Sequence, residues 1–247
     1  MTNRRKLIVA ILGASALLFG IAAADPGPRS EKSAAAPVQL DEASVIVEIN
    51  DTDGDAGLQV FVDAEPWRSL TVTGPNGEDV GDLLRVTAQG RLENYGLTEL
   101  FSESNEPPFD IFPLKRFKRK FPEGRYTFSG STIDGQPLEG SARLSHDFPN
   151  GPNTKAPTDG ATVARGGVVA RWGPGGQPQG VDLIGYRVIV TREDPLRIFS
   201  ADLRPSARKL RIPWRFLEPG TEYQLEIQTI DRSGNQTSTD TTFTVEE

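Results

Sequence analysis

Three aspartates at alternate positions, Asp51, Asp53 and Asp55, have the spacing most typical of a metal site in this chain. With the small residues between and after them, in Asp-Thr-Asp-Gly-Asp-Ala-Gly, they can wrap carboxylate oxygens around a hard cation. Calcium takes roughly six to eight oxygen ligands in flexible loops, so the spacing favours calcium. The match to an EF-hand fails, because Gly57 comes one position late and Val62 stands where the bidentate glutamate belongs. The alternative is a polar turn whose Asp and Gly residues satisfy turn geometry.

A second group of carboxylates, Glu99, Glu103 and Glu106, follows about fifty residues later. Paired carboxylates perform glycoside hydrolysis, so an alternative function is a small carbohydrate-active hydrolase or its accessory domain using these residues. The chain has no cysteine and one histidine, His146, although nucleophilic triads and transition-metal sites usually draw on these residues. The composition therefore favours a protein that is not an enzyme and holds no cofactor, calcium excepted.

The same segment can instead form a binding surface. Glu103, Glu106, Phe109 and Phe112 belong to an insertion over residues 99–121, and Phe101, Phe109 and Phe112 are expected to be exposed and to dock onto another exported protein or a polysaccharide. Pro113 suits the first position of a short helix in which Leu114, Phe117 and Phe121 share one face. The five basic residues between them then form either a solvated helix face or a surface for an anionic ligand or a membrane.

The elements that position these residues are predicted to be strands. Alternating apolar residues predict strands over residues 45–49, 58–62 and 70–72, and again over 184–190 and 223–229. A turn of the Pro-Gly type followed by tyrosine occurs twice, ending at Tyr126 and at Tyr223. This is the pattern of a tyrosine corner, in which the phenol hydroxyl bonds back to the backbone of a β-sandwich. The fold class expected is all-β, with two tandem sandwiches and one short helix in the first.

The C-terminal part resembles a fibronectin type III domain. The resemblance is carried by Trp172, Tyr186, the Leu-Glu-Pro-Gly-Thr-Glu-Tyr run at residues 217–223 and the turn at 231–235. That resemblance implies a seven-stranded sandwich used as a spacer or interaction module, and no catalytic residue comes with it.

The whole chain is also similar to a group of uncharacterised exported bacterial proteins that join an Ig-like sandwich to a fibronectin type III-like one. The matching stretches are residues 51–57, 96–100, 106–107 and 121–126. This resemblance implies the domain layout and brings no assigned activity.

The domain layout expected is a signal peptide at residues 1–24, a flexible linker at 25–38, an Ig-like sandwich at 39–148 and a fibronectin type III-like domain at 149–247. Basic residues precede an apolar run that ends in small residues, which is typical of a cleaved export signal. The alternative is an uncleaved membrane anchor. After cleavage no stable membrane span is expected, and the protein is expected to be secreted or periplasmic.

The charge of the chain bears on its partners. Removing Arg4, Arg5 and Lys6 from 27 basic residues leaves 24 against 34 acidic ones, a net charge of −10. Nucleic-acid binding needs clustered basic residues that release counterions, so this balance argues against nucleic acid as a partner. The ligand, an exported protein or a polysaccharide, is not specified by the sequence.

Overall fold

Residues 36–75 and 81–247 are described by the computed structural model of this chain, in which strands predominate and one α-helix is present among these residues. The predicted signal peptide at residues 1–24 and nearly all of the predicted linker lie outside the described residues. No helix in the described ranges is long and apolar enough to cross a bilayer. The predicted all-β class with one short helix is therefore confirmed for the described part of the chain.

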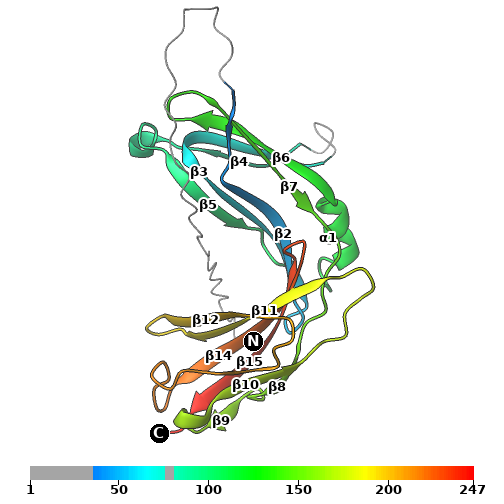
Figure 1. Ribbon diagram of the computed structural model, residues 1–247, viewed down its shortest axis with the longest axis vertical. Coiled ribbons are helices and arrows are strands. Elements are labelled where there is room, and N and C mark those ends of the chain that lie inside the picture. Colours follow the sequence, from blue (N-terminus) through cyan, green and yellow to red (C-terminus); the bar gives the residue numbers. More distant parts are fainter. Residues whose placement is uncertain (1–35, 76–80) are drawn as a thin grey trace, which may run out of the picture.

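Two hydrophobic cores divide the molecule along its long axis (Figure 1). The N-terminal half surrounds the first core and consists of β1 (Val38–Gln39), β2 (Glu42–Asn50), β3 (Asp55–Thr73), β4 (Asp82–Thr87), β5 (Leu97–Glu103), α1 (Leu114–Lys120), β6 (Gly124–Thr132) and β7 (Pro137–Leu144). The C-terminal half surrounds the second core and consists of β8 (Asn153–Ala156), β9 (Ala161–Val163), β10 (Val169–Gly173), β11 (Leu183–Arg192), β12 (Arg197–Leu203), β13 (Lys209–Arg211), β14 (Glu222–Asp231) and β15 (Gln236–Val245).

Strand β3 organises the N-terminal half, because it pairs with four other strands. Its first part pairs with β2 and β5, and its second part pairs with β4 and β6. The register shifts between Asp63 and Trp67, next to Pro66, which has no N–H to donate to a ladder. The sequence predicted two separate strands here, at residues 58–62 and 70–72. The structure shows one strand of 19 residues that continues through the irregularity.

The insertion predicted at residues 99–121 divides into two parts. Its beginning belongs to β5, which pairs with β3 and is an ordinary member of the sheet. Its end forms α1, as the spacing predicted: Phe117 and Phe121 are buried in the first core and Leu114 packs against it. The ring centroids of the two phenylalanines lie 4.9 Å apart. Burial of this face fixes the helix against the N-terminal half.

The C-terminal half has two sheets on either side of its core. Three strands in the order β13-β10-β8 form one sheet, and β15-β14-β11-β12 run side by side in the other. Trp172 from the first sheet and Tyr186 from the second are both buried, with ring centroids 5.5 Å apart. The alternation predicted for residues 223–229 corresponds to the buried face of β14, and that predicted for 184–190 holds from Tyr186 onward. Ile184 is exposed, because the register of β11 shifts between Leu183 and Gly185.

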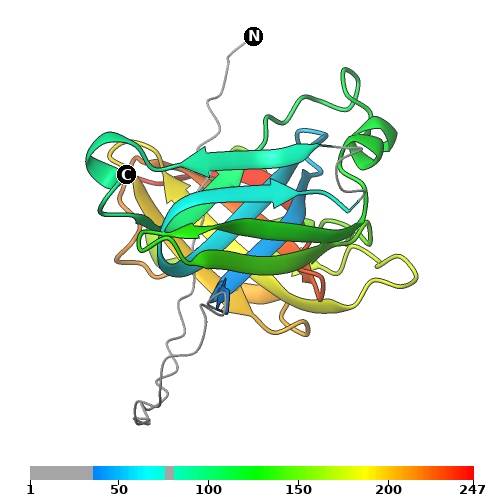
Figure 2. The ribbon, with the colours of Figure 1, turned by 90° about the horizontal axis from the view of Figure 1, so that it is seen from above.

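One sheet passes through both halves, which the sequence did not predict. β15 pairs in parallel with β2 through Gln236, Thr237 and Ser238, opposite Glu48, Ile49 and Asn50. This pairing makes a sheet of twelve strands that includes members of both halves. Figure 1 shows β2 (blue) meeting β15 (red) between the halves, and Figure 2, seen from above, shows the upper strands crossing obliquely over these two.

Both predicted tyrosine corners are present. The hydroxyl of Tyr126 donates to the carbonyl of Pro122 at 3.0 Å. The hydroxyl of Tyr223 accepts from the backbone N–H of Glu218 at 2.8 Å and donates to the carbonyl of Phe216 at 3.3 Å. Both tyrosine side chains are buried. Burial raises the pKa of Tyr126 to about 12.

The two corners should differ in strength. Tyr223→Phe removes a donor and an acceptor contact and should lower the free energy of unfolding by about 2 kcal/mol, whereas Tyr126→Phe removes one bond and should lower it by about 1 kcal/mol. Urea unfolding at neutral pH measures both values. Tyr95→Phe is the control, because Tyr95 is 81% exposed. If both corner variants lose the same unfolding free energy, the second hydrogen bond of Tyr223 does not contribute to stability.

Candidate functional site at the junction of the two halves

A carboxylate and three glutamine amides meet where β2 pairs with β15. Glu48 Oε2 accepts from Gln236 Nε2 at 2.6 Å, from Gln59 Nε2 at 2.8 Å and from Gln228 Nε2 at 3.5 Å. Gln59 and Glu48 come from the N-terminal half, and the other two glutamines come from the C-terminal half. All three glutamines are at least 92% buried, with exposed fractions of 7% for Gln59, 4% for Gln228 and 8% for Gln236. The halves are therefore joined by side chains as well as by backbone.

Two further glutamates extend this group, which we call the junction network: Glu48, Gln59, Glu103, Glu226, Gln228 and Gln236. Gln59 Nε2 also donates to Glu103 Oε1 at 2.9 Å, and Gln228 Nε2 contacts Glu226 Oε1 at 2.6 Å. Glu106 covers the network's edge above Gly57, where an added Cβ would come within 2.6 Å of Glu106 Oε1. A side chain at position 57 would therefore displace the Glu106 carboxylate from this place.

Burial raises the pKa of Glu48 to about 7, and the neighbouring carboxylates of Glu103 and Glu106 contribute to the rise. Hydrogen bonds from Gln59 and Gln236 act in the opposite direction. Burial also raises the pKa of Glu226 well above its usual range, with the charges of Glu48 and Asp240 adding to the effect. Here the Gln228 hydrogen bond and the charge of Arg187 oppose the shift. The junction network therefore retains protons at pH values where exposed glutamates are ionised.

A protonated Glu226 accounts for two details of the geometry. The contact between Gln228 and Glu226 is 2.6 Å, a separation typical of an O–H···O bond. Among the described residues the side-chain oxygen of Gln228 has no hydrogen-bond partner, although it is buried. The orientation of a glutamine amide is an assignment, and turning this one over lets its oxygen accept the proton of Glu226, at the cost of the 3.5 Å contact between Gln228 Nε2 and Glu48. The amide oxygen then has a partner.

Asn235, in the turn between β14 and β15, makes a second set of bonds across the junction. Its Oδ1 accepts from the backbone N–H of Val47 at 2.8 Å, and its Nδ2 donates to the carbonyls of Ser145 at 2.9 Å and Asp147 at 3.3 Å. The side chain is 1% exposed. The neighbouring Gly234 has φ +91 and packs close to Ile46. The turn of the C-terminal half is thus inserted into the N-terminal half.

The three predicted calcium ligands lie beside the junction. Residues 51–54 form the turn between β2 and β3, as the polar-turn alternative predicted, and Asp55 already belongs to β3. Asp51 Oδ2 accepts from the backbone N–H of Gly151 at 3.0 Å, and Asp53 Oδ2 lies 3.4 Å from Asn50 Nδ2. Within residues 36–75 and 81–247, no three acidic or histidine side chains are arranged to hold a metal ion. Calcium at Asp51, Asp53 and Asp55 stays a prediction.

The residues of the predicted binding surface occupy different environments. Glu103 and Glu106 are half-buried at the junction, whereas Phe109 and Phe112 are half-buried against the first core. Phe101 is the one of the three predicted aromatics that the structure places at the exposed surface. The binding surface stays a prediction, although its two glutamates do lie at the site where the halves meet.

The residues suggested for hydrolysis do not form a separate group. Glu99 is exposed on β5, four residues before Glu103, which is hydrogen-bonded to Gln59. His146, which the sequence placed at the boundary, has Nε2 at 2.8 Å from the carbonyl of Phe121. A carbonyl only accepts, so Nε2 carries the proton. The junction residues Glu48, Gln59, Gln228, Gln236 and Asn235 were missed by the sequence analysis, because each occupies a polar strand or turn position that predicts exposure.

This chain has low similarity to several solved structures. No family model matches it, and no curated protein sequence is similar to it. The similar solved structures include a bacterial ice-binding adhesin (13% identity, TM-score 0.28, 85% of this chain and 65% of that chain). A segment of two fibronectin type III domains from chicken tenascin has 13% identity and a TM-score of 0.28, and the match covers 82% of this chain and 97% of that chain. Domains FN1–FN3 of chicken CNTN1 have 12% identity and a TM-score of 0.30, and the match covers 83% of this chain and 64% of that chain. The chain thus spans less than two thirds of the adhesin and CNTN1 chains.

The raised pKa of Glu48 predicts a specific pH dependence. The unfolded chain releases this proton near pH 4.5 and the folded protein near pH 7. Between these values only the folded state holds the proton, so this group's contribution to stability falls as the pH rises through that window, by up to about 3 kcal/mol. Glu48→Gln removes the titration. The variant should therefore gain stability relative to wild type between pH 5 and pH 8.

Urea unfolding of both proteins at several pH values measures this difference. Glu42→Gln is the matched control, because Glu42 is an exposed glutamate on the same strand. Its stability should follow that of wild type at every pH. If the curves of Glu48→Gln and wild type run parallel from pH 5 to pH 8, Glu48 does not hold a proton in the folded state.

Proposed function

We propose that this protein is an exported, non-enzymatic binding or scaffold protein in which two β-sandwich domains are held in one fixed orientation. The proposed domains are an Ig-like sandwich at residues 39–148 and a fibronectin type III-like domain at 149–247. Export to the periplasm or the cell exterior follows from the predicted signal at residues 1–24. Its partner is an exported protein or a polysaccharide.

The fibronectin type III-like assignment is supported by the strand order of the C-terminal half. A three-stranded sheet, β13-β10-β8, faces four strands, β15-β14-β11-β12, across one core. This is the layer arrangement of a seven-stranded sandwich. The tyrosine corner at Tyr223 and the buried Trp172 occupy the positions that the resemblance implied.

The Ig-like assignment is supported by the pairing of β3. Its first part lies in a layer with β2 and β5, and its second part lies with β4 and β6, to which β7 is added. The first core collects buried residues from both parts of β3, from β2 and from β6. A tyrosine corner at Tyr126 is again present.

The observation that carries the scaffold proposal is the sheet shared through β2 and β15. Two domains connected only by a flexible linker move independently, because little surface is buried between them. Here backbone pairing, the junction network and Asn235 all join the halves. A protein built in this way is suited to hold two surfaces at a defined distance and angle.

The hydrolase alternative has less support. Paired catalytic carboxylates require access to substrate within a cleft. Glu103 is half-buried and its carboxylate accepts from Gln59, while Glu99 is exposed on the sheet surface. Turnover of a glycan or peptide by the purified protein that is lost in Glu103→Gln would overturn the non-enzymatic assignment.

The scaffold proposal predicts that Asn235→Ala loosens the junction. The substitution removes three hydrogen bonds to the N-terminal half and leaves the Val47 N–H and two carbonyls without their partner. We expect a loss of about 2–3 kcal/mol in unfolding free energy and a larger radius of gyration in small-angle X-ray scattering. Ser233→Ala in the same turn is the control, because its hydroxyl has no partner in the described structure. Identical scattering and stability for the two variants would contradict the proposal.

A further inference from the structure

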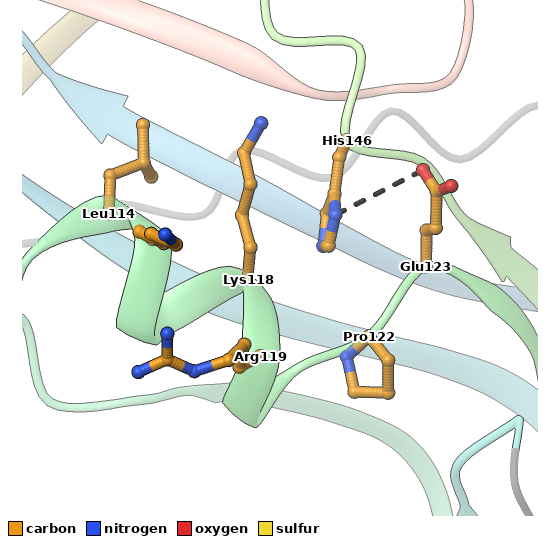
Figure 3. Close-up of a pocket in the computed structure, with 7 residues that line it drawn as sticks. Leu114, Lys118, Arg119, Pro122, Glu123 and His146 are labelled. Carbon is orange, nitrogen blue, oxygen red and sulfur yellow. Dashed lines mark ion pairs between the residues drawn. The ribbon is translucent and has the colours of Figure 1, made fainter.

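An open hollow lies beside α1 in the N-terminal half (Figure 3). Its volume is about 880 Å³. Figure 3 shows side chains from the helix on one side and Glu123 and His146 on the other. Its lining residues are Leu114, Lys115, Lys118, Arg119, Pro122, Glu123 and His146. The hollow thus combines three permanent cations and a histidine with two apolar side chains.

The basic charge on α1 stands out against the acidic chain, whose net charge is −7. Five of the seven residues of α1 are lysine or arginine. None of the ion pairs within the described ranges involves these five side chains. The helix therefore presents unneutralised positive charge to the hollow and to solvent.

Helix stability does not account for the whole of this charge. Cations in the last turn, Lys118, Arg119 and Lys120, interact favourably with the helix dipole. Lys115 and Arg116 lie in the first turn, where the dipole favours acidic residues, and no acidic residue is present there. Arg116 lies over the Phe112 ring, 5.0 Å from its centroid, which offsets its cost. The placement of Lys115 costs stability, so a role in binding explains Lys115 better than a structural role does.

The walls of the hollow are held in place by packing. Lys118 Nζ lies 4.6 Å from the centroid of the Phe148 ring, which fixes this lysine on the rim. His146 donates from Nε2 to the Phe121 carbonyl, and its Nδ1 lies 4.0 Å from Glu123 Oε2. The one acidic side chain lining the hollow is therefore already next to a histidine. Lys115 and Arg119 remain exposed, one helical turn apart.

We propose that this hollow binds the acidic groups of an anionic polysaccharide. The proposal rests on the binding role proposed above and specifies its ligand class. Arginine and lysine are the residues that recognise carboxylate, sulfate and phosphate groups. The spacing of Lys115 and Arg119, about 6 Å along the helix axis, suits charges that repeat on successive sugar residues of an extended chain.

The shape of the hollow favours a saccharide chain over a membrane surface. Pockets for small ligands typically enclose about 300–1,000 Å³, and this one lies within that range. Because it is open to solvent, a polymer can pass through it while one or two residues occupy it. Leu114 and Pro122 supply apolar contacts for the faces of sugar rings. A bilayer surface requires projecting groups, whereas these cations surround a recess.

The test uses the protein lacking residues 1–24 and three oligosaccharide probes. Isothermal titration calorimetry measures binding of oligogalacturonate (carboxylates), of a heparin-derived oligomer (sulfates) and of a neutral dextran oligomer. We expect at least one anionic probe to bind and the neutral one not to bind. The association constant should fall about tenfold between 50 and 200 mM salt, because counterions are released when charges pair.

The informative variant is Lys115→Glu/Arg119→Glu, since both residues are exposed and both line the hollow. Its control is Arg204→Glu/Lys209→Glu, which makes the same change in net charge at exposed positions of the C-terminal half. We expect at least a tenfold loss of affinity in the first variant and little change in the second. Circular dichroism confirms that both variants are folded.

Three outcomes would overturn the proposal. Equal loss in both variants would mean that net charge alone attracts the probe. Absence of binding to either anionic oligosaccharide would exclude the ligand class. Binding to vesicles containing anionic lipid, without binding to the oligosaccharides, would assign the hollow to a membrane surface. The scaffold role is tested separately by scattering of Asn235→Ala, so failure here leaves that result unchanged.

Discussion

The parallel pairing of β15 with β2 is the constraint on which the rest of the structure depends. Three residue pairs join strands of the two halves into one sheet, and polar side chains of that sheet are buried where the halves meet. Buried carboxylates are costly unless they are hydrogen-bonded or protonated. The junction network meets this requirement with three glutamine amides around Glu48 and with raised pKa values at Glu48 and Glu226. The joint is therefore specific in its geometry and sensitive to protonation.

Charge is divided between two regions of the molecule. Acidic side chains gather at the junction, where amides and protons satisfy them, whereas the densest basic charge lies on α1 at the edge of the N-terminal half. This separation suits a scaffold in which one region fixes the shape and another contacts a partner. The cationic hollow is lined by residues of α1 and by residues 122, 123 and 146, none of which belongs to the junction network.

Local patterns in the sequence predicted much of this fold, and long-range pairing explains what they missed. Alternation placed the buried face of β14 and, from Tyr186 onward, that of β11. The spacing of Leu114, Phe117 and Phe121 placed α1, and both tyrosine corners formed. The continuous β3 was missed because Pro66 normally ends a strand. The junction was missed for a different reason. Glu48 and Gln59 alternate with buried apolar residues, and this pattern predicts that their side chains face solvent. They are buried instead because β15, which lies nearly 190 positions later in the chain, pairs with β2.

The central claim is that the two halves have one fixed relative orientation, and a distance measurement between them tests it most directly. The chain contains no cysteine, so Thr127→Cys in the N-terminal half and Arg204→Cys in the C-terminal half can both be spin-labelled without background. Both positions are exposed. Double electron–electron resonance should give a single narrow distance distribution for this pair. A broad distribution, as from domains joined by a flexible linker, would contradict the account.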